Sequence, residues 1–328
     1  MSERIIDMRE KTVKQWLSCK VDLSRQIDPP EPLLIQSETG IPLLYRRGIH
    51  VSSGKQKAGK TFFNSILMAA LLNPDGFCGF RPTKTIFKVL FVDTEQDAAD
   101  SQEVIRRIHR INGWETDQNH PRLIGMNLRE FSAEQRIKLV EESLMDVSPD
   151  VLVIDGIVDL CVDFNSLEES HRLTTMLLRW AVMYDVSIVT TLHINKGNGE
   201  LRGHLGSFLA QKGENVIKIT KENDGIAYMN CKVIDARHKP IDDFAFRIVE
   251  GIPEVYEPLE TNKPPIDYED LFEGILKQPL RYNNLVDGVV KSTGKSIPTA
   301  KRYIDAAVRM KIIENNHGFY ECKNNLPF

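Results

Sequence analysis

One run of residues constrains this chain more than any other: Gly54-Lys55-Gln56-Lys57-Ala58-Gly59-Lys60-Thr61, which reads G-x-x-x-x-G-K-T. A short, β-branched stretch at 48–53 precedes it, and an apolar run of good helix formers at 62–72 follows it. Glycines between a strand and a helix let backbone N–H groups face a polyphosphate, and the helix N-terminus adds its dipole. The run therefore predicts a phosphate-binding loop in an α/β fold.

Two side chains of the loop have predicted roles of their own. Lys60 is expected to reach the β- and γ-phosphates as a point charge, and Thr61 to hold Mg²⁺ through its hydroxyl. The predicted nucleotide-binding set is Gly54, Lys55, Gln56, Lys57, Ala58, Gly59, Lys60, Thr61 and Phe62.

Two acidic side chains follow apolar runs that are typical of buried parallel strands. Glu95 comes after the run 87–93, and Asp155 ends the run 151–155. Open α/β sheets place ligands at the carboxyl ends of such strands. Asp155 is therefore expected to hold Mg²⁺. Glu95 either accepts the proton of a water that attacks the γ-phosphate or caps the helix that starts near Asp97. Asp159, in a predicted loop, either contacts metal or is solvated.

A third predicted strand, 186–193, ends in His193, which either senses the γ-phosphate or only packs. The stretch 197–206 is rich in glycine. It is either a plain crossover or a mobile loop whose cations contact a DNA backbone. The predicted DNA contacts of this loop are Lys196, Arg202 and His204.

The pattern changes twice further along the chain. From residue 215 the sheet is expected to continue antiparallel, with Arg237 at a hairpin tip. Beyond a linker at 257–266, three short helices and a β-hairpin describe a winged helix. Its third helix carries Lys301 and Arg302, and it either enters a DNA groove or docks on protein.

The length of 328 residues suits one large core with an accessory module. The predicted parts are an N-terminal arm (1–45), a RecA-like ATPase domain (46–256), the linker (257–266) and the winged helix (267–328). The arm lies either across the nucleotide site, on a neighbouring subunit or over the edge of the core.

Composition limits the partners. A net charge of −4 gives no overall attraction to nucleic acid, so DNA must meet a local basic patch or an assembled ring. The five cysteines are scattered, which favours neither zinc nor a disulfide framework. No apolar run is long enough to span a membrane, and we expect a cytoplasmic protein.

The order of these motifs resembles that of RecA-fold ATPases. Together with the phosphate loop, the resemblance is carried by Leu90–Glu95, Val153–Asp155 and Leu192–Lys196, and it covers roughly residues 45–250. The chain is most similar to RepA-type hexameric replicative helicases of plasmids and related mobile elements.

This resemblance implies residue roles by position. Lys60 would be the phosphate lysine, Thr61 and Asp155 the magnesium ligands, Glu95 the catalytic glutamate, His193 the γ-phosphate sensor and Arg237 an arginine finger that enters a neighbour's site. The sequence departs from the family pattern at Asp235, where a lysine is common, and at Lys55 and Lys57, where glycine or proline is common.

The resemblance implies an ATP- and Mg²⁺-dependent motor that forms a homo-oligomeric ring, a hexamer, on single-stranded DNA, with duplex contacts through the winged helix. An alternative of another class is an ATP-switched DNA-binding regulator, or an accessory protein of mobilisation or integration. A recombinase-like filament is a third possibility.

Overall fold

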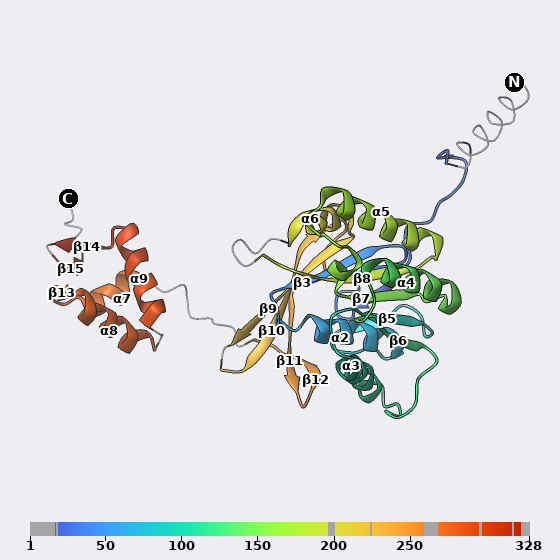
Figure 1. Ribbon diagram of the computed structural model, residues 1–328. Coiled ribbons are helices and arrows are strands. Elements are labelled where there is room, and N and C mark those ends of the chain that lie inside the picture. The colour runs from blue at the N-terminus through green and yellow to red at the C-terminus, as the bar shows by residue number, and fades with distance from the viewer. Residues whose placement is uncertain are drawn as a thin grey trace, which may run out of the picture. The chain divides into compact units, whose positions relative to one another are not determined.

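The computed structural model describes residues 17, 19–195, 201–223, 225–258, 268–294, 297–316 and 318–322. The chain divides into two compact units, Met1–Pro258 and Leu259–Phe328 (Figure 1).

A nine-stranded sheet in the order β12-β11-β10-β9-β3-β8-β7-β5-β6 forms the centre of the first unit. Six strands run parallel: β3 (Ile49–Gly54), β5 (Val89–Asp93), β6 (Leu123–Asn127), β7 (Val151–Asp155), β8 (Ser187–His193) and β9 (Asn215–Asn223). Three continue antiparallel: β10 (Ala227–Ala236), β11 (Phe244–Val249) and β12 (Ile252–Val255). Because β9 pairs in parallel with β3, the antiparallel part begins one strand later than the sequence pattern predicts.

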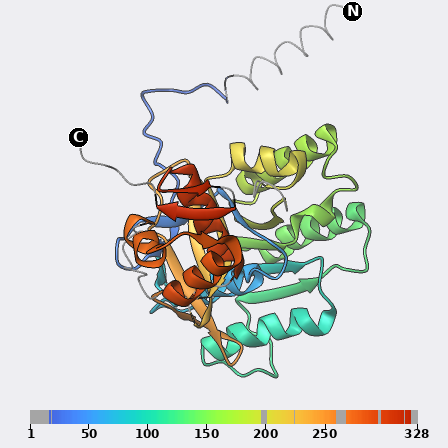
Figure 2. The ribbon, with the colours of Figure 1, turned by 90° about the vertical axis from the view of Figure 1, so that its left-hand side faces the viewer.

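Helices cover both faces of this sheet. α2 (Lys60–Leu72) and α3 (Ala98–Ile111) lie on one face, and α4 (Ala133–Val147), α5 (Leu167–Met183) and α6 (Gly203–Lys212) lie on the other (Figures 1 and 2). Alternation along a strand feeds both layers: Val89 and Phe91 of β5 face the α2 side, whereas Leu90 faces the α5 side. This two-layer cover explains why the central strands are continuous apolar runs.

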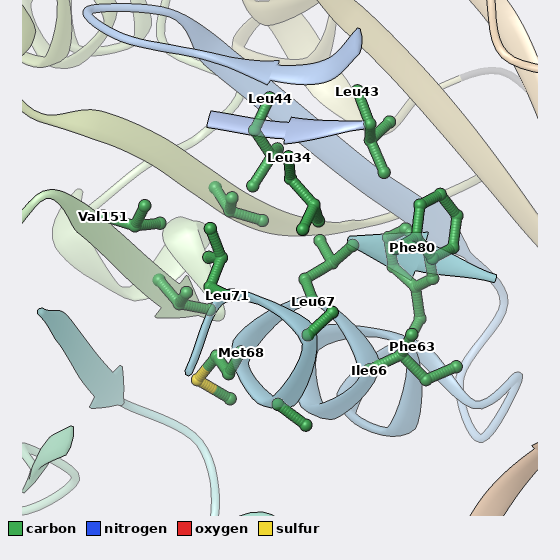
Figure 3. Close-up of a cluster of buried hydrophobic side chains, with 14 of the residues drawn as sticks. Leu34, Leu43, Leu44, Phe63, Ile66, Leu67, Met68, Leu71, Phe80 and Val151 are labelled. Carbon is green, nitrogen blue, oxygen red and sulfur yellow. The ribbon is translucent and has the colours of Figure 1, made fainter. Parts of the chain in front are cut away.

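A small antiparallel sheet, β2-β1-β4, covers α2 from outside. It consists of β1 (Pro32–Gln36), β2 (Pro42–Tyr45) and β4 (Phe80–Pro82). Leu34 and Leu44 are fully buried against the helix, beside Leu67 (Figure 3). Residues 32–45 of the predicted arm therefore cover the core, as one of its expected placements has it, and they share a hydrophobic cluster with the ATPase domain. This cover also explains why α2 is apolar on nearly all sides.

Local capping defines where the helices begin. Asp97 caps α3 by accepting the Ala99 N–H, so the suggestion that Glu95 caps this helix is wrong. Ser132 and Gln135 form a capping box at α4. A short 3₁₀ helix, η1 (Ile157–Leu160), replaces the loop predicted after Asp155.

The second unit contains α7 (Tyr268–Ile275), α8 (Tyr282–Thr293) and α9 (Ile297–Arg309) with a three-stranded antiparallel sheet. The strands are β13 (Leu280–Arg281), β14 (Ile313–Asn316) and β15 (Phe319–Cys322). Its own core includes the buried Phe272, Leu285 and Ile304. Among the described residues of the whole chain, no helix is both long and apolar enough to cross a membrane.

A candidate nucleotide site at the carboxyl edge of the sheet

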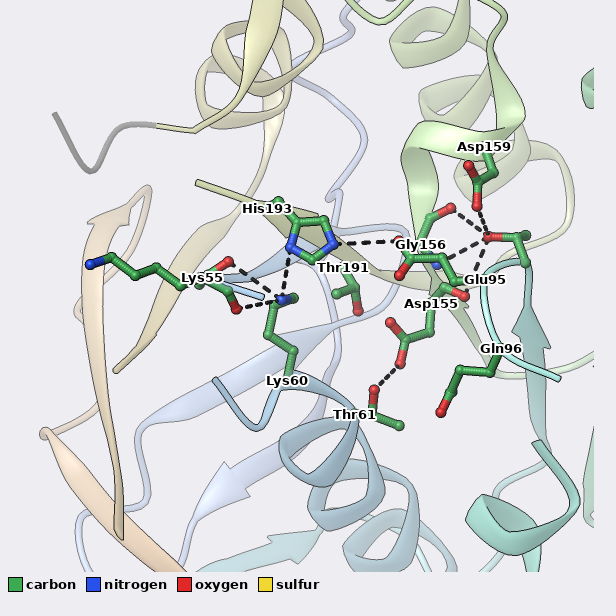
Figure 4. A network of polar contacts seen from close by, with 12 residues as sticks. Lys55, Lys60, Thr61, Glu95, Gln96, Asp155, Gly156, Asp159, Thr191 and His193 are labelled. Atoms are coloured by element: carbon green, nitrogen blue, oxygen red, sulfur yellow. Dashed lines mark hydrogen bonds and ion pairs between the residues drawn. The ribbon is translucent and has the colours of Figure 1, made fainter. Parts of the chain in front are cut away.

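The candidate site lies where β3, β8, β7 and β5 end side by side. Gly54 is in register with His193, and Asp93 with Asp155. Parallel pairing brings these strand ends to one edge, which is where open α/β sheets bind ligands. Figure 4 shows the polar side chains that meet there.

Glycine is required at two points of the phosphate loop. Gly59 has a φ of +93°, and a Cβ there would lie 2.7 Å from Cγ of Met229. A Cβ on Gly54 would lie 2.6 Å from the carbonyl oxygen of Ile219. The loop therefore passes close to β9 and β10 and turns sharply into α2, which begins at Lys60. This is the cradle that a polyphosphate needs.

Lys60 is 6% exposed and lies inside the loop. Its Nζ is 3.0 Å from the carbonyl oxygen of Lys55 and 3.1 Å from Nδ1 of His193. Burial lowers the pKa of Lys60, and the carboxylates of Asp155 and Glu95 oppose that shift. Because an ammonium group only donates, Nδ1 of His193 accepts and its Nε2 carries the ring proton.

His193 Nε2 faces Glu95, with 3.6 Å between Nε2 and Oε1. This contact with His193 lowers the pKa of Glu95, against the effect of burial. The position of Glu95 is set by Asp93, whose Oδ1 accepts the Glu95 N–H at 3.1 Å. A Cβ on Gly156 would overlap the Glu95 carboxylate. The fold therefore holds an ionised acid at the end of β5.

Thr61 and Asp155 meet on the other side of Lys60. The Thr61 hydroxyl donates to Oδ2 of Asp155 at 2.7 Å. Burial raises the pKa of Asp155 to about 6; the Thr61 hydrogen bond opposes this shift, and the charges of Asp93 and Glu95 add to it. A hydroxyl and a carboxylate are oxygen ligands of the kind that Mg²⁺ prefers, and a cation would favour the ionised carboxylate. These residues fit a magnesium ion.

Sequence reasoning missed the side chains that support the site. Asp93 is fully buried and also accepts from Ser101 Oγ at 2.8 Å. Asn64 donates to Thr191 Oγ1 at 2.8 Å and so ties α2 to β8. Thr94 donates to Asp159 at 3.0 Å. The sequence does mark Asn64, because it is a polar residue inside the apolar run 62–72.

Two other predicted site residues, Phe62 and Arg202, lie beside this network. Phe62, assigned to nucleotide binding, stacks under the Arg107 guanidinium, 3.9 Å from its ring centroid. Arg202 lies over the Phe164 ring, and its N–H donates to the His193 carbonyl at 3.1 Å. A cavity of about 740 Å³ lies between the phosphate loop and the residues that follow β8. It is lined by Lys55, Gln56, His193, Ile194, Asn195 and Arg202.

The glycine-rich stretch is partly helical, which corrects its description as a loop. α6 begins at Gly203, so His204 is an exposed residue of its first turn. Lys196 lies outside the described residues. In the second unit, Lys301 is exposed on α9, and the side chain of Arg302 is outside the described part of the chain.

Arg237 lies at the opposite end of the same sheet. β10 ends at Ala236, which pairs with Asn215, and Asn215 in turn pairs with His50 near the start of β3. The phosphate loop follows the other end of β3. The Arg237 side chain is 54% exposed, and its Nε is 3.7 Å from Oε2 of Glu214. Arg237 is therefore not part of its own chain's nucleotide site.

The fold and this site define a RecA-like phosphate-loop ATPase. A family model described as an AAA domain matches residues 15–199 of the 328, and the chain belongs to that family. A comparison with curated proteins finds no match. The prediction of a nucleotide-dependent ATPase, with ATP bound as is usual with Mg²⁺, is thereby confirmed at the level of the class. The RepA-type assignment stays a prediction.

Proposed function

We propose that this protein is an ATP-driven motor that assembles as a ring of identical subunits, a hexamer, on single-stranded DNA of a mobile or extrachromosomal element. The supporting observation is that the predicted arginine finger and the other predicted catalytic side chains lie at opposite ends of the sheet. Glu95, Lys60 and Asp155 meet at one end of the sheet, whereas Arg237 is presented at the other end. A second copy would have to bring the two together.

Within one subunit, the side chains are arranged for phosphoryl transfer to water. Lys60 exchanges its carbonyl and imidazole partners for phosphate oxygens when ATP binds. Thr61 and Asp155 would hold a magnesium ion, which would supply positive charge beside the phosphates. Glu95 accepts the proton of the attacking water, and His193, between Glu95 and Lys60, senses the γ-phosphate.

Arg237 of the neighbouring copy would stabilise the charge that develops in the transition state. An arginine supplied in trans is worth ~10³–10⁵ in rate. The exposed position of Arg237 at the end of β10 suits this role. Isolated subunits should therefore bind ATP but turn it over slowly.

The DNA contacts would come from the region that connects β8 to α6. We assign Lys196, Arg202 and His204 to the backbone of a single strand. Arg202 is joined to His193 by its own N–H, so this region adjoins the proposed phosphate sensor.

A second candidate function depends on the C-terminal unit. Three helices with a three-stranded antiparallel sheet have the composition of a winged helix, and α9 would carry Lys301 and Arg302 into a duplex groove. The protein would then be a DNA-binding regulator, or an accessory protein of mobilisation or integration, in which ATP controls assembly.

The test is the ATPase rate per subunit across dilution, with and without single-stranded DNA, for the wild type and for Glu95→Gln. We expect a rate that rises with protein concentration and with DNA. Glu95→Gln should lower it by ~10²–10⁴, while Glu134→Gln on the surface of α4 should not. A rate that stays flat on dilution would remove the ring. Sequence-specific duplex binding that survives Lys60→Ala, without strand displacement, would favour the regulator.

A further inference from the structure

Lys55, the second residue of the phosphate loop, carries a positive charge at the rim of the nucleotide site. Its carbonyl oxygen accepts from Nζ of Lys60 at 3.0 Å, so its backbone lies where a phosphate would bind. The residue is exposed, and its side chain extends away from Lys60 and His193 (Figure 4). In the described part of the chain, this side chain forms no ion pair. The ammonium group is therefore available to a group from outside.

The surroundings of Lys55 favour a negatively charged partner. Lys55 lines the cavity beside the phosphate loop, together with Arg202. None of the described residues that line this cavity is acidic. Charges across an interface are arranged so that a positive surface meets a negative one. A carboxylate or a phosphate is thus the group that suits this rim.

Asp235 is an exposed acid on the strand that presents Arg237. β10 ends at Ala236, and the Arg237 N–H extends the pairing by donating to the Glu214 carbonyl at 2.8 Å. In extended backbone, side chains two residues apart point to the same side, with their Cα atoms about 7 Å apart. Asp235 forms no ion pair with the residues that the structure describes. A neighbouring copy that receives Arg237 therefore also meets the carboxylate of Asp235.

Lys55 and Asp235 do not meet within one chain. Asp235 pairs with Val216, and Val216 pairs with Val51 of β3. Lys55 follows Val51 by four residues, which corresponds to about 13 Å along the strand and about 10 Å across two strand spacings. This separation exceeds the combined reach of the two side chains. Any ion pair between them joins two copies.

We propose that Lys55 of one copy pairs with Asp235 of the next copy and so positions the strand that carries Arg237 at the nucleotide site. Without a cation, a carboxylate beside a triphosphate would repel it. Lys55 neutralises this charge at the rim and leaves the guanidinium of Arg237 free for the phosphates. Lys55 is then a positioning residue that acts between copies. The inference rests on the proposed function, because Arg237 has to enter a neighbour's site.

Carbodiimide coupling tests the pair directly, because it joins a lysine to a carboxylate that touches it. Unlabelled and isotope-labelled full-length chains are mixed with a non-hydrolysable ATP analogue and Mg²⁺, coupled and digested. We expect a peptide that joins Lys55 to Asp235 and combines both labels, and no such peptide from Asp235→Asn. Lys84 and Glu31 pair within one chain and should give a peptide of a single label in the same digest. Recovery of that control peptide alone would contradict the pair.

Exchanging the two charges gives a second, independent measurement. Lys55→Asp places two acids opposite each other and should raise the protein concentration needed for half-assembly roughly tenfold. Asp235→Lys in the same chain restores the attraction and should bring this concentration back to within about threefold of the wild type. Lys57→Asp is the matched control in the phosphate loop, and Asp235→Lys should not relieve its effect.

The outcomes separate this pair from the ring itself. If the wild type assembles but Asp235→Lys does not relieve Lys55→Asp, the ion pair is wrong although the ring stands. If Lys55→Asp assembles like the wild type and loses only its stimulation by single-stranded DNA, Lys55 binds a DNA phosphate and the pair is again wrong. If the wild type with ATP and Mg²⁺ stays monomeric at all concentrations, the proposed ring itself fails.

Discussion

The two ends of the central sheet are built in opposite ways. At the carboxyl end of the parallel strands, polar side chains are bonded to one another, and Lys60 and Asp155 are 6% and 5% exposed. At the other end, Arg237 and His238 are 54% and 45% exposed beside Glu214. The first arrangement is suited to hold a ligand in a fixed geometry, whereas the second exposes the positive charge of Arg237. The proposed function, in which two copies complete one site, rests on this difference.

The largest effect is expected when two variants, each defective at one end of the sheet, are mixed. Arg237→Ala and Lys60→Ala should each lower turnover by ~10³ or more, because each removes charge stabilisation of the transition state. Mixed together, they should recover part of the activity, since some interfaces then pair an intact loop with an intact arginine. The ATPase rate of the mixture is the measurement.

Lys239→Ala, in the same turn as Arg237, is the matched control for this experiment and should retain activity. A mixture that shows only the sum of the two separate rates would mean that Arg237 does not act on a neighbour's site.

The space that Gly156 leaves for Glu95 gives a second test at the ligand-holding end. Gly156→Ala places a methyl group where the Glu95 carboxylate lies. Displacing a general base forfeits its contribution, so turnover should fall by ~10²–10⁴ while ATP affinity changes little. Steady-state rates together with ATP titration measure both quantities.

Gly274→Ala, whose added Cβ would meet nothing within 4 Å, serves as the control. An unchanged turnover in Gly156→Ala would show that Glu95 is not held where water activation needs it.

At the opposite end of the sheet, the pH dependence of stability tests the burial of His50, which lies near the start of β3. His50 is 1% exposed, and burial lowers its pKa to about 4. The unfolded chain keeps the ordinary pKa of about 6.5, so the unfolded state binds the proton more readily. Burial of neutral His50 therefore costs no stability above pH ~6.5. As the pH falls toward 4, the free energy of unfolding decreases by about 3 kcal/mol.

His50→Gln should remove this part of the acid destabilisation, and His204→Gln, on the surface, should not. Denaturant unfolding followed by tryptophan fluorescence reports on the first unit alone, because Trp16, Trp114 and Trp180 all belong to it. An identical pH profile in wild type and His50→Gln would contradict the assignment.

The sequence was enough to predict the ligand-holding end. The run 151–155 matches β7, and the run of helix formers at 62–72 lies within α2, because buried strands and helices leave local patterns. The strand-end residues follow from this, since parallel strands carry Lys60, Glu95, Asp155 and His193 to one edge.

Features that depend on distant pairing could not be predicted in the same way. The small sheet of β1, β2 and β4 joins segments about 45 residues apart, and its short strands have no distinctive period of their own. Asp93 is the last residue of an apolar run in the sequence, and only the four hydrogen bonds that it accepts reveal that it positions Glu95. The end of the sheet at which Arg237 lies depends on the register of β10 with β9.

The smallest expected effect concerns the contact between Arg237 and Glu214. Their Nε–Oε2 distance is 3.7 Å and the arginine is more than half exposed, so the pair contributes at most about 1 kcal/mol to stability. Glu214→Gln should therefore leave folding almost intact and free Arg237 for a neighbour, raising turnover by no more than about fivefold.

The matched substitution is Glu254→Gln, which breaks a similar exposed pair with Arg247 at 3.2 Å and should not change turnover. Glu214→Gln distinguishes two possible roles of Glu214 toward Arg237. A modest gain indicates that Glu214 only restrains the arginine within its own chain. A loss as large as that of Arg237→Ala would indicate instead that the carboxylate orients the guanidinium toward the neighbouring site, and Arg237 would then act as half of a pair.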